Sequence, residues 1–178
     1  MGPASKTPRY ARLMIEGLTE AGVSIVTALP ESLLRSFYRL VAEEPGIRYI
    51  RVSNEADMPG IVTGAYLGGK KAVMVMENSG IRQACEPIGR LAFDSHIPMV
   101  MIMPYRGDVG EANWWGHSHA WTMEPILNAM RIPYRVIRQL DEIKPNIKRV
   151  LRHADSSQWP VALILAGDCL EVPSHAAD

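Results

Sequence analysis

The fold is indicated most clearly by residues 47–76, which read IRYIRVSNEADMPGIVTGAYLGGKKAVMVM. Ile47–Val52 and Ala72–Met76 are short and mostly apolar, as is typical of buried strands. Between them, Glu55–Leu67 has a helical pattern with small residues that permit close packing onto a sheet, and a glycine pair follows it. A strand, a helix and a second strand in this order predict a parallel βαβ unit.

The same alternation continues on both sides of this unit. The remaining expected strands are Val23–Leu29, Ile97–Met103, Tyr134–Ile137 and Val161–Ala166, and the remaining expected helices are Pro8–Ala21, Ser32–Val41, Ile81–Phe93, Trp121–Met130 and Asp141–His153. The strand runs lack an alternation of apolar and polar residues, so both faces of the sheet are expected to be buried. The sequence therefore predicts an α/β fold: a doubly wound, mainly parallel six-stranded sheet with helices on both faces. Pro104–Ala120 is expected to be a long polar and aromatic loop.

Composition narrows the possible partners. The chain has 178 residues, 47% of them apolar, and a formal net charge of zero. One folded domain is expected over residues 10–172, between flexible ends at 1–9 and 173–178. Nucleic acid and anionic membranes are not expected as main partners, because phosphate binding needs a concentrated basic face. No apolar run approaches the roughly 20 residues that span a bilayer, and no signal peptide precedes residue 10, so a cytoplasmic protein is expected.

The residues best suited to chemistry follow the predicted strands, where parallel sheets bind their ligands. Glu55 is the first candidate, although a carboxylate in the first turn of a helix can simply complement the helix dipole. Asn78-Ser79-Gly80 offers an amide, a hydroxyl and a permissive backbone, or alternatively an ordinary turn. No Gly-rich dinucleotide fingerprint, phosphate loop or serine nucleophile elbow is present.

Histidine and cysteine give no clear metal site. His117 and His119 alternate in the sequence without a nearby third ligand, which is a weak zinc pattern, and a polar loop facing a cleft or a partner is the simpler interpretation. Cys85 and Cys169 lie far apart and are expected to be reduced, buried thiols. No metal ligand is therefore assigned to this chain.

Several of these motifs together resemble a known family. The matching runs are Ser53-Asn54-Glu55-Ala56, Gly64 to Lys71, Met76 to Gly80, Tyr105 to Glu111 and Ile132-Pro133-Tyr134. They resemble the α subunit of sulfopyruvate decarboxylases and, equally, the N-terminal part of phosphonopyruvate decarboxylases. Both are thiamine diphosphate-dependent decarboxylases, and the resemblance extends from about Arg12 to Gly167.

The resemblance implies the domain that binds the aminopyrimidine ring of the cofactor. The glutamate at the position of Glu55 would hydrogen-bond N1′ of that ring and exchange a proton with it, so that the cofactor can attack a 2-oxo acid. The expected cofactor contacts are Pro30, Glu55, Asn78, Ser79 and Gly80, and the expected substrate contacts are Ser32, Arg82, His117 and His119.

The diphosphate-binding half of this family is not found in the sequence. The resemblance implies a Gly-Asp-Gly stretch followed by an Asn to hold the diphosphate and Mg²⁺, whereas the nearest run here is Gly167-Asp168-Cys169, with few residues after it. A separate β subunit is therefore expected to supply that motif and the metal, in an α2β2 or larger complex.

Two departures from the family pattern leave other functions open. Arg82 places a long cation where the family has small residues, and the run from Asn113 to Trp121 is unusually aromatic. One alternative is a lyase or carboligase acting on a bulkier, aromatic substrate. The other is a non-catalytic subunit that stabilises or regulates a partner.

Overall fold

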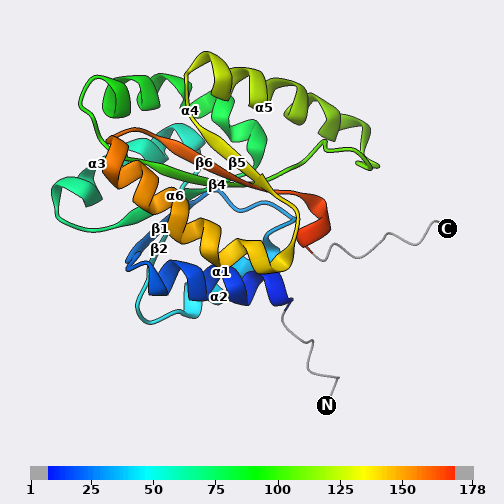
Figure 1. The fold of residues 1–178 in the computed structure, drawn as a ribbon, viewed down its shortest axis with the longest axis horizontal. Coiled ribbons are helices and arrows are strands. Elements are labelled where there is room, and N and C mark those ends of the chain that lie inside the picture. The colour runs from blue at the N-terminus through cyan, green and yellow to red at the C-terminus, as the bar shows by residue number, and fades with distance from the viewer. Residues whose placement is uncertain (1–7, 171–178) are drawn as a thin grey trace.

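A computed structural model describes residues 8–170, which form one parallel sheet between two layers of helices (Figure 1). The strands are β1 (Ile25–Ala28), β2 (Arg48–Arg51), β3 (Ala72–Val75), β4 (Val100–Pro104), β5 (Tyr134–Ile137) and β6 (Val161–Leu165). Their order across the sheet is β2-β1-β3-β4-β6-β5, and every neighbouring pair is parallel. The predicted doubly wound, six-stranded sheet is confirmed.

Each face of the sheet has its own apolar core. Helices α1 (Arg9–Glu20), α2 (Arg35–Glu43) and α6 (Ile143–Ser157) cover one face, whereas α3 (Met58–Leu67), α4 (Ile81–Ile88) and α5 (His117–Ala129) cover the other (Figure 1). The second core is rich in methionine, with Met74 and Met101 on adjacent strands and both fully buried. Burial on both faces explains why the central strands are apolar throughout.

The connections from β1 and β3 place the candidate site. Ile25 of β1 pairs with Arg48 of β2 on one side and with Ala72 of β3 on the other. After β1 the chain adds β2 on one side of β1, and it then returns to add β3 on the other side. In open α/β sheets such a reversal leaves a crevice at the carboxyl ends of the strands, and ligands bind there.

Helix α2 begins later than expected. The helix was expected to begin at Ser32, but α2 starts at Arg35, and the Ser32 hydroxyl bonds another partner, described below. The carboxylate of Glu31 instead accepts hydrogen bonds from the backbone N–H groups of Leu33, at 2.7 Å, and Leu34, at 2.5 Å. The two oxygens of the carboxylate each accept from one of these N–H groups.

The prediction of a loop over Pro104–Ala120 was wrong for the second half of this segment. Trp114–Gly116 forms a 3₁₀ turn and α5 begins at His117, four residues before the predicted start. No side chain caps this helix, so no local pattern marks where it begins. Just before it, Gly116 packs tightly against Glu111, since a Cβ on Gly116 would lie 2.9 Å from the Glu111 side chain.

Two further observations concern the ends and the connections. Within the expected helix Ile81–Phe93, the helix type changes just after Pro87, because α4 ends at Ile88 and continues as a π-helical turn, Gly89–Phe93. Most of the segments predicted to be flexible, residues 1–9 and 173–178, lie outside the described residues, and that prediction stays open. None of the helices described here has the length and apolar character needed to cross a bilayer.

Candidate active site

Glu55 and Gly80 lie in direct contact at the carboxyl edge of the sheet. Glu55 opens a 3₁₀ turn, Glu55–Asp57, whose start is capped by the Asn54 side chain accepting from the Ala56 N–H at 2.9 Å. Gly80 closes another 3₁₀ turn after β3, Asn78–Gly80. A Cβ on Gly80 would lie 2.6 Å from Cγ and 2.8 Å from Oε1 of Glu55. Glu55 and Gly80, two of the expected cofactor contacts, are thus brought together. A residue larger than glycine at position 80 would clash with the Glu55 side chain as it stands.

The Glu55 carboxylate is half-buried and lacks a polar partner among the described residues. Among residues 8–170, no side chain or backbone group forms a hydrogen bond or an ion pair with it. A half-buried carboxylate normally has such partners, since loss of hydration must be offset. This carboxylate is therefore available to a ligand that brings its own hydrogen-bond donor.

Asn78 joins the loops that follow β3 and β4. Its side chain is fully buried, and Nδ2 donates to the backbone carbonyl of Arg106 at 2.9 Å. Its Oδ1 is buried with no hydrogen-bond partner within the described part of the chain. Because Asn78 holds the loop after β4 from inside the protein, its structural role is established, while its predicted cofactor contact stays a prediction.

Arg106 organises the loops after β1 and β4. It is 6% exposed; one guanidinium nitrogen donates to the Ser32 hydroxyl at 2.9 Å and another lies 3.3 Å from Oε2 of Glu111. The guanidinium also stacks over the Trp115 ring, 4.8 Å from its centre. Burial opposes the charge of Glu111, but hydrogen bonds from Asn113 and the proximity of Arg106 hold the pKa of Glu111 below its ordinary value.

Glu77, Ser79 and His119 form a second polar group beside the first. Oε1 of Glu77 accepts from the Ser79 hydroxyl at 3.0 Å and lies 2.7 Å from Nδ1 of His119. The His119 ring packs against Trp115, with 5.6 Å between ring centres. Two predicted site residues, Ser79 and His119, therefore share one carboxylate that the sequence interpretation did not assign to the site.

Glu31 adds a further carboxylate after β1. Burial is the main reason why the pKa of Glu31 lies above its ordinary value, and the negative charge of Glu77 acts in the same direction. The two backbone N–H groups at the start of α2 and the nearby Arg106 act in the opposite direction. This side of the crevice is consequently acidic, since Glu31, Glu77 and Glu111 surround a single buried arginine.

Three of the predicted residues are less closely involved. His117 stacks against the exposed Trp121 ring, with 6.1 Å between ring centres, and no contact with Glu77 is formed. Arg82 is exposed, and its Nε donates back to the Ser79 carbonyl at 3.2 Å. Pro30 is half-buried in the loop after β1, with no contact that distinguishes it.

Three large apolar side chains are exposed between the loop that follows β4 and the start of α5. Trp114 is 85% exposed, Trp121 is 73% exposed and Val109 is fully exposed. Exposed aromatic and apolar side chains of this size are frequent in protein interfaces. Together these three residues are called the aromatic rim below.

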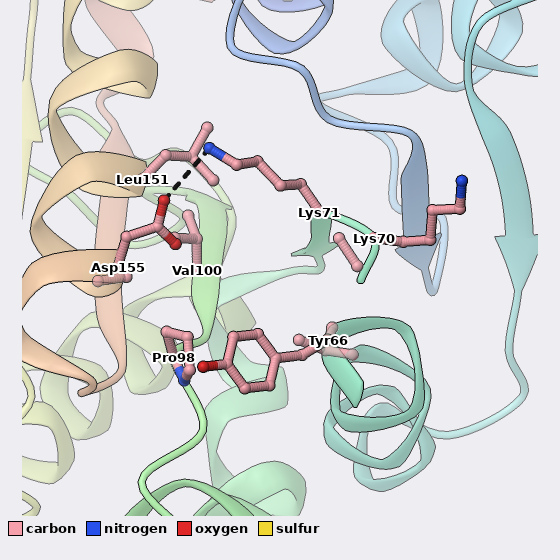
Figure 2. A pocket seen from close by; sticks show the side chains of 10 residues that line it. Tyr66, Lys70, Lys71, Pro98, Val100, Leu151 and Asp155 are labelled. Carbon is pink, nitrogen blue, oxygen red and sulfur yellow. Dashed lines mark hydrogen bonds and ion pairs between the residues drawn. The ribbon is translucent and has the colours of Figure 1, made fainter. Parts of the chain in front are cut away.

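The pocket drawn in Figure 2 lies at the opposite, amino edge of the sheet. Lys71 precedes β3 and bonds Asp155 of α6 at 3.2 Å, while Tyr66 and Pro98 close the other side (Figure 2). Its volume of about 30 Å³ has room for little more than one or two water molecules. The amino-edge pocket is therefore too small for an organic ligand. In the described residues, no group of three or more His, Cys, Asp or Glu side chains is arranged to hold a metal ion.

Sequence reasoning missed the most highly connected residues of the site. Glu31, Glu77, Arg106 and Glu111 received no role, yet Arg106 bonds both Ser32 and Glu111, and Glu77 contacts both Ser79 and His119. One pattern was available: Glu77 and Arg106 each come within two residues of the end of an apolar strand. A charged side chain just after a parallel strand lies at the carboxyl edge of the sheet. If it is buried there, it needs an opposite charge or a hydrogen-bond partner.

Comparisons with known proteins agree with the geometry of this edge. Residues 8–114 match the model of the family described as thiamine pyrophosphate enzyme, N-terminal TPP binding domain. The chain is 31% identical over 151 residues to sulfopyruvate decarboxylase subunit alpha of Methanococcus maripaludis, covering 84% of this chain and 90% of that protein. It is 29% identical over 156 residues to the same subunit of Methanocaldococcus jannaschii, covering 88% and 92%.

A second group of relatives matches over a shorter range. The chain is 34% identical over 98 residues to phosphonopyruvate decarboxylase of Streptomyces viridochromogenes, covering 55% of this chain and 25% of that protein. The matched family range includes Glu55, Asn78–Gly80 and the Arg106–Glu111 segment.

Proposed function

The chain belongs to the thiamine pyrophosphate enzyme family through its N-terminal TPP-binding domain, and from this premise we propose that it is the pyrimidine-binding subunit of a two-chain 2-oxo acid decarboxylase. The single observation that carries the proposal is the Glu55 carboxylate, half-buried and unpartnered among the described residues, resting on Gly80.

These residues fit the aminopyrimidine ring of thiamine diphosphate. At N1′ the ring presents a basic nitrogen, which needs a hydrogen-bond donor. The Glu55 carboxyl group can donate this bond when it is protonated, and the absence of a side chain on Gly80 leaves space for it. Ser79, held by Glu77, and Asn78, with an unpartnered buried Oδ1, are the neighbouring polar groups on the same turn.

The division of labour follows from these roles. Bound thiamine diphosphate supplies a carbon nucleophile and the electron sink that decarboxylation of a 2-oxo acid requires. Glu55 holds and exchanges a proton at the ring nitrogen, which is general acid–base catalysis. Ser32, Arg82, His117 and His119 remain the proposed substrate contacts, with Ser32 positioned by Arg106.

A non-catalytic stabilising or regulatory subunit is the less favoured alternative. A subunit without a ligand would have no use for a half-buried carboxylate that lacks a partner, because such a group costs stability. A lyase or carboligase on a bulkier, aromatic substrate is favoured by the acidic lining and by Trp115, which is 40% exposed beside the crevice. This second candidate uses the same cofactor and the same Glu55.

We place the diphosphate and Mg²⁺ on a β subunit with a Gly-Asp-Gly…Asn motif, in an α2β2 or larger cytoplasmic complex. The support is that the relatives of matching length are named as alpha subunits. Calorimetry of the purified chain with thiamine diphosphate and Mg²⁺ should then show very weak binding, because the charged end of the cofactor has no partner. Adding the β subunit should restore tight binding. Submicromolar binding by the chain alone would contradict this division of the cofactor.

The aromatic rim is proposed to dock on the β subunit. Truncating a buried interface Trp typically costs about 2 kcal/mol or more, or at least a roughly 30-fold loss of affinity. Trp114→Ala and Trp121→Ala should therefore weaken assembly, measured by sedimentation, with activity recovered at high protein concentration. Leu67→Ala is the matched control, since Leu67 is 74% exposed at the end of α3, away from the rim. Unchanged assembly of both Trp variants would exclude the rim from the interface.

A further inference from the structure

We propose that Glu77 and His119 form an acid–base dyad, in which Glu77 keeps a proton on Nδ1 of His119 and the free Nε2 acts as a proton acceptor in the active site. The inference rests on the proposed function, because the acceptor serves that reaction. Glu77 is a positioning residue in this scheme, and His119 is the catalytic one.

The geometry of the pair is the first support. Oε1 of Glu77 lies 2.7 Å from Nδ1 of His119, and their side chains are only 22% and 14% exposed. The oxygen lies off the direction of a linear N–H donation, and Nδ1 has no other partner in the described chain. Ser79 holds the carboxylate through its hydroxyl at 3.0 Å, and Trp115 packs on the imidazole.

The other ring nitrogen is available for chemistry. Among residues 8–170, no group bonds Nε2 of His119, and Nε2 is not one of the buried unpartnered atoms, so solvent or a ligand can reach it. Helix α5, which carries His119 in its first turn, packs against the turn Asn78–Gly80. Glu55 rests on Gly80 in that same turn. The dyad and the proposed cofactor carboxylate therefore share one structural element.

The surrounding charges favour a neutral imidazole. Burial is the largest cause that holds the pKa of His119 below its ordinary value, and the positive charges of Arg82 and Arg106 act in the same direction. Glu77 and Glu111 oppose them without reversing the direction. A pKa held below its ordinary value favours the neutral form of the His119 imidazole.

A neutral ring whose Nδ1 is protonated can only accept at Nε2, because the hydrogen bond of one nitrogen determines the tautomer. This favours proton acceptance from a hydroxyl group over donation to a substrate carboxylate. In the step, the O–H bond breaks, its electron pair stays on oxygen and the proton moves to Nε2. The resulting imidazolium is stabilised by Glu77, and the proton returns when the oxygen is protonated again.

The first test needs neither cofactor nor partner. In ¹⁵N-histidine-labelled chain, two-bond ¹H–¹⁵N correlations report the tautomer of each of the five histidines. His119, assigned by loss of its signals in His119→Asn, should carry its proton on Nδ1 at pH 7. Glu77→Ala should shift the proton to Nε2, whereas His117→Asn should leave the His119 signals unchanged. A proton on Nε2 in the wild-type chain would overturn the dyad.

The second test uses the reconstituted complex. His119→Asn should lower kcat on the order of 10²-fold, at the lower end of the range for general acid–base groups, and should remove the acid limb from the pH profile. Glu77→Ala should move that limb to lower pH, because its carboxylate raises the pKa of His119. His153→Asn, at an exposed position of α6 that has no proposed role in the site, should do neither, and circular dichroism should confirm that all three variants are folded.

Failure of the proposed function and failure of the dyad inference would give different results. A wild-type complex without thiamine-dependent decarboxylation would overturn the proposed function, and the acceptor role would fall with it, whatever the tautomer of His119. Normal decarboxylation by His119→Asn, with the acid limb retained, would overturn the inference and leave the proposed function standing.

Discussion

Replacement of Glu55 by Gln is expected to leave the fold and the assembly intact and to lower turnover on the order of 10²- to 10⁴-fold, the range for general acid–base groups. Gln keeps the size of the side chain and can still form a hydrogen bond, but it cannot exchange a proton. The Glu55 carboxylate makes no hydrogen bond or ion pair within the described chain, so the change removes no structural bond. The measurement is kcat of the reconstituted complex at saturating thiamine diphosphate.

Asp57→Asn provides the matched control for Glu55→Gln. Asp57 lies in the same 3₁₀ turn, is exposed and accepts no capping hydrogen bond. Its amide variant should keep wild-type turnover, which would assign the effect to Glu55 rather than to the charge of the turn. If Glu55→Gln retains more than about a tenth of the wild-type rate, Glu55 is not a general acid–base group of the kind that contributes 10²-fold or more.

Gly80→Ala is expected to have an effect of similar size by a different route. The new Cβ would lie 2.6 Å from Cγ of Glu55, so the glutamate side chain must move away. Displacing a reacting group by about 1 Å can lower the rate by about 10²-fold. Gly80 has a φ of −64°, which alanine also adopts, so the backbone should tolerate the change. The measurement is kcat together with the thermal unfolding midpoint.

Gly64→Ala is the control for the added methyl group. Gly64 lies inside α3, and nothing lies within 4 Å of the position of its Cβ. Alanine is favoured over glycine in a helix interior by roughly 0.5–1 kcal/mol, so this variant should be slightly more stable and fully active. Full activity in Gly80→Ala would show that the contact with Glu55 does not set the position of the carboxylate.

The sequence by itself determined the order of the elements and the class of fold. Runs such as Ala72–Val75 and Val161–Leu165 are apolar at every position because both faces of the sheet are covered. That local property can be recognised without knowing what covers them. Glu55 and Asn78–Gly80 were identified for a related reason: each follows a strand, and parallel strands place their carboxyl ends at one edge.

Only the tertiary structure decided how the site is connected. Ser32 was expected to begin a helix, but it bonds Arg106, which lies 74 residues later in the chain. His119, in the first turn of α5, lies beside Glu77, which follows β3. Such contacts join segments that are far apart in sequence. Buried charges must find partners wherever the fold places them, and no local pattern specifies which partner that will be.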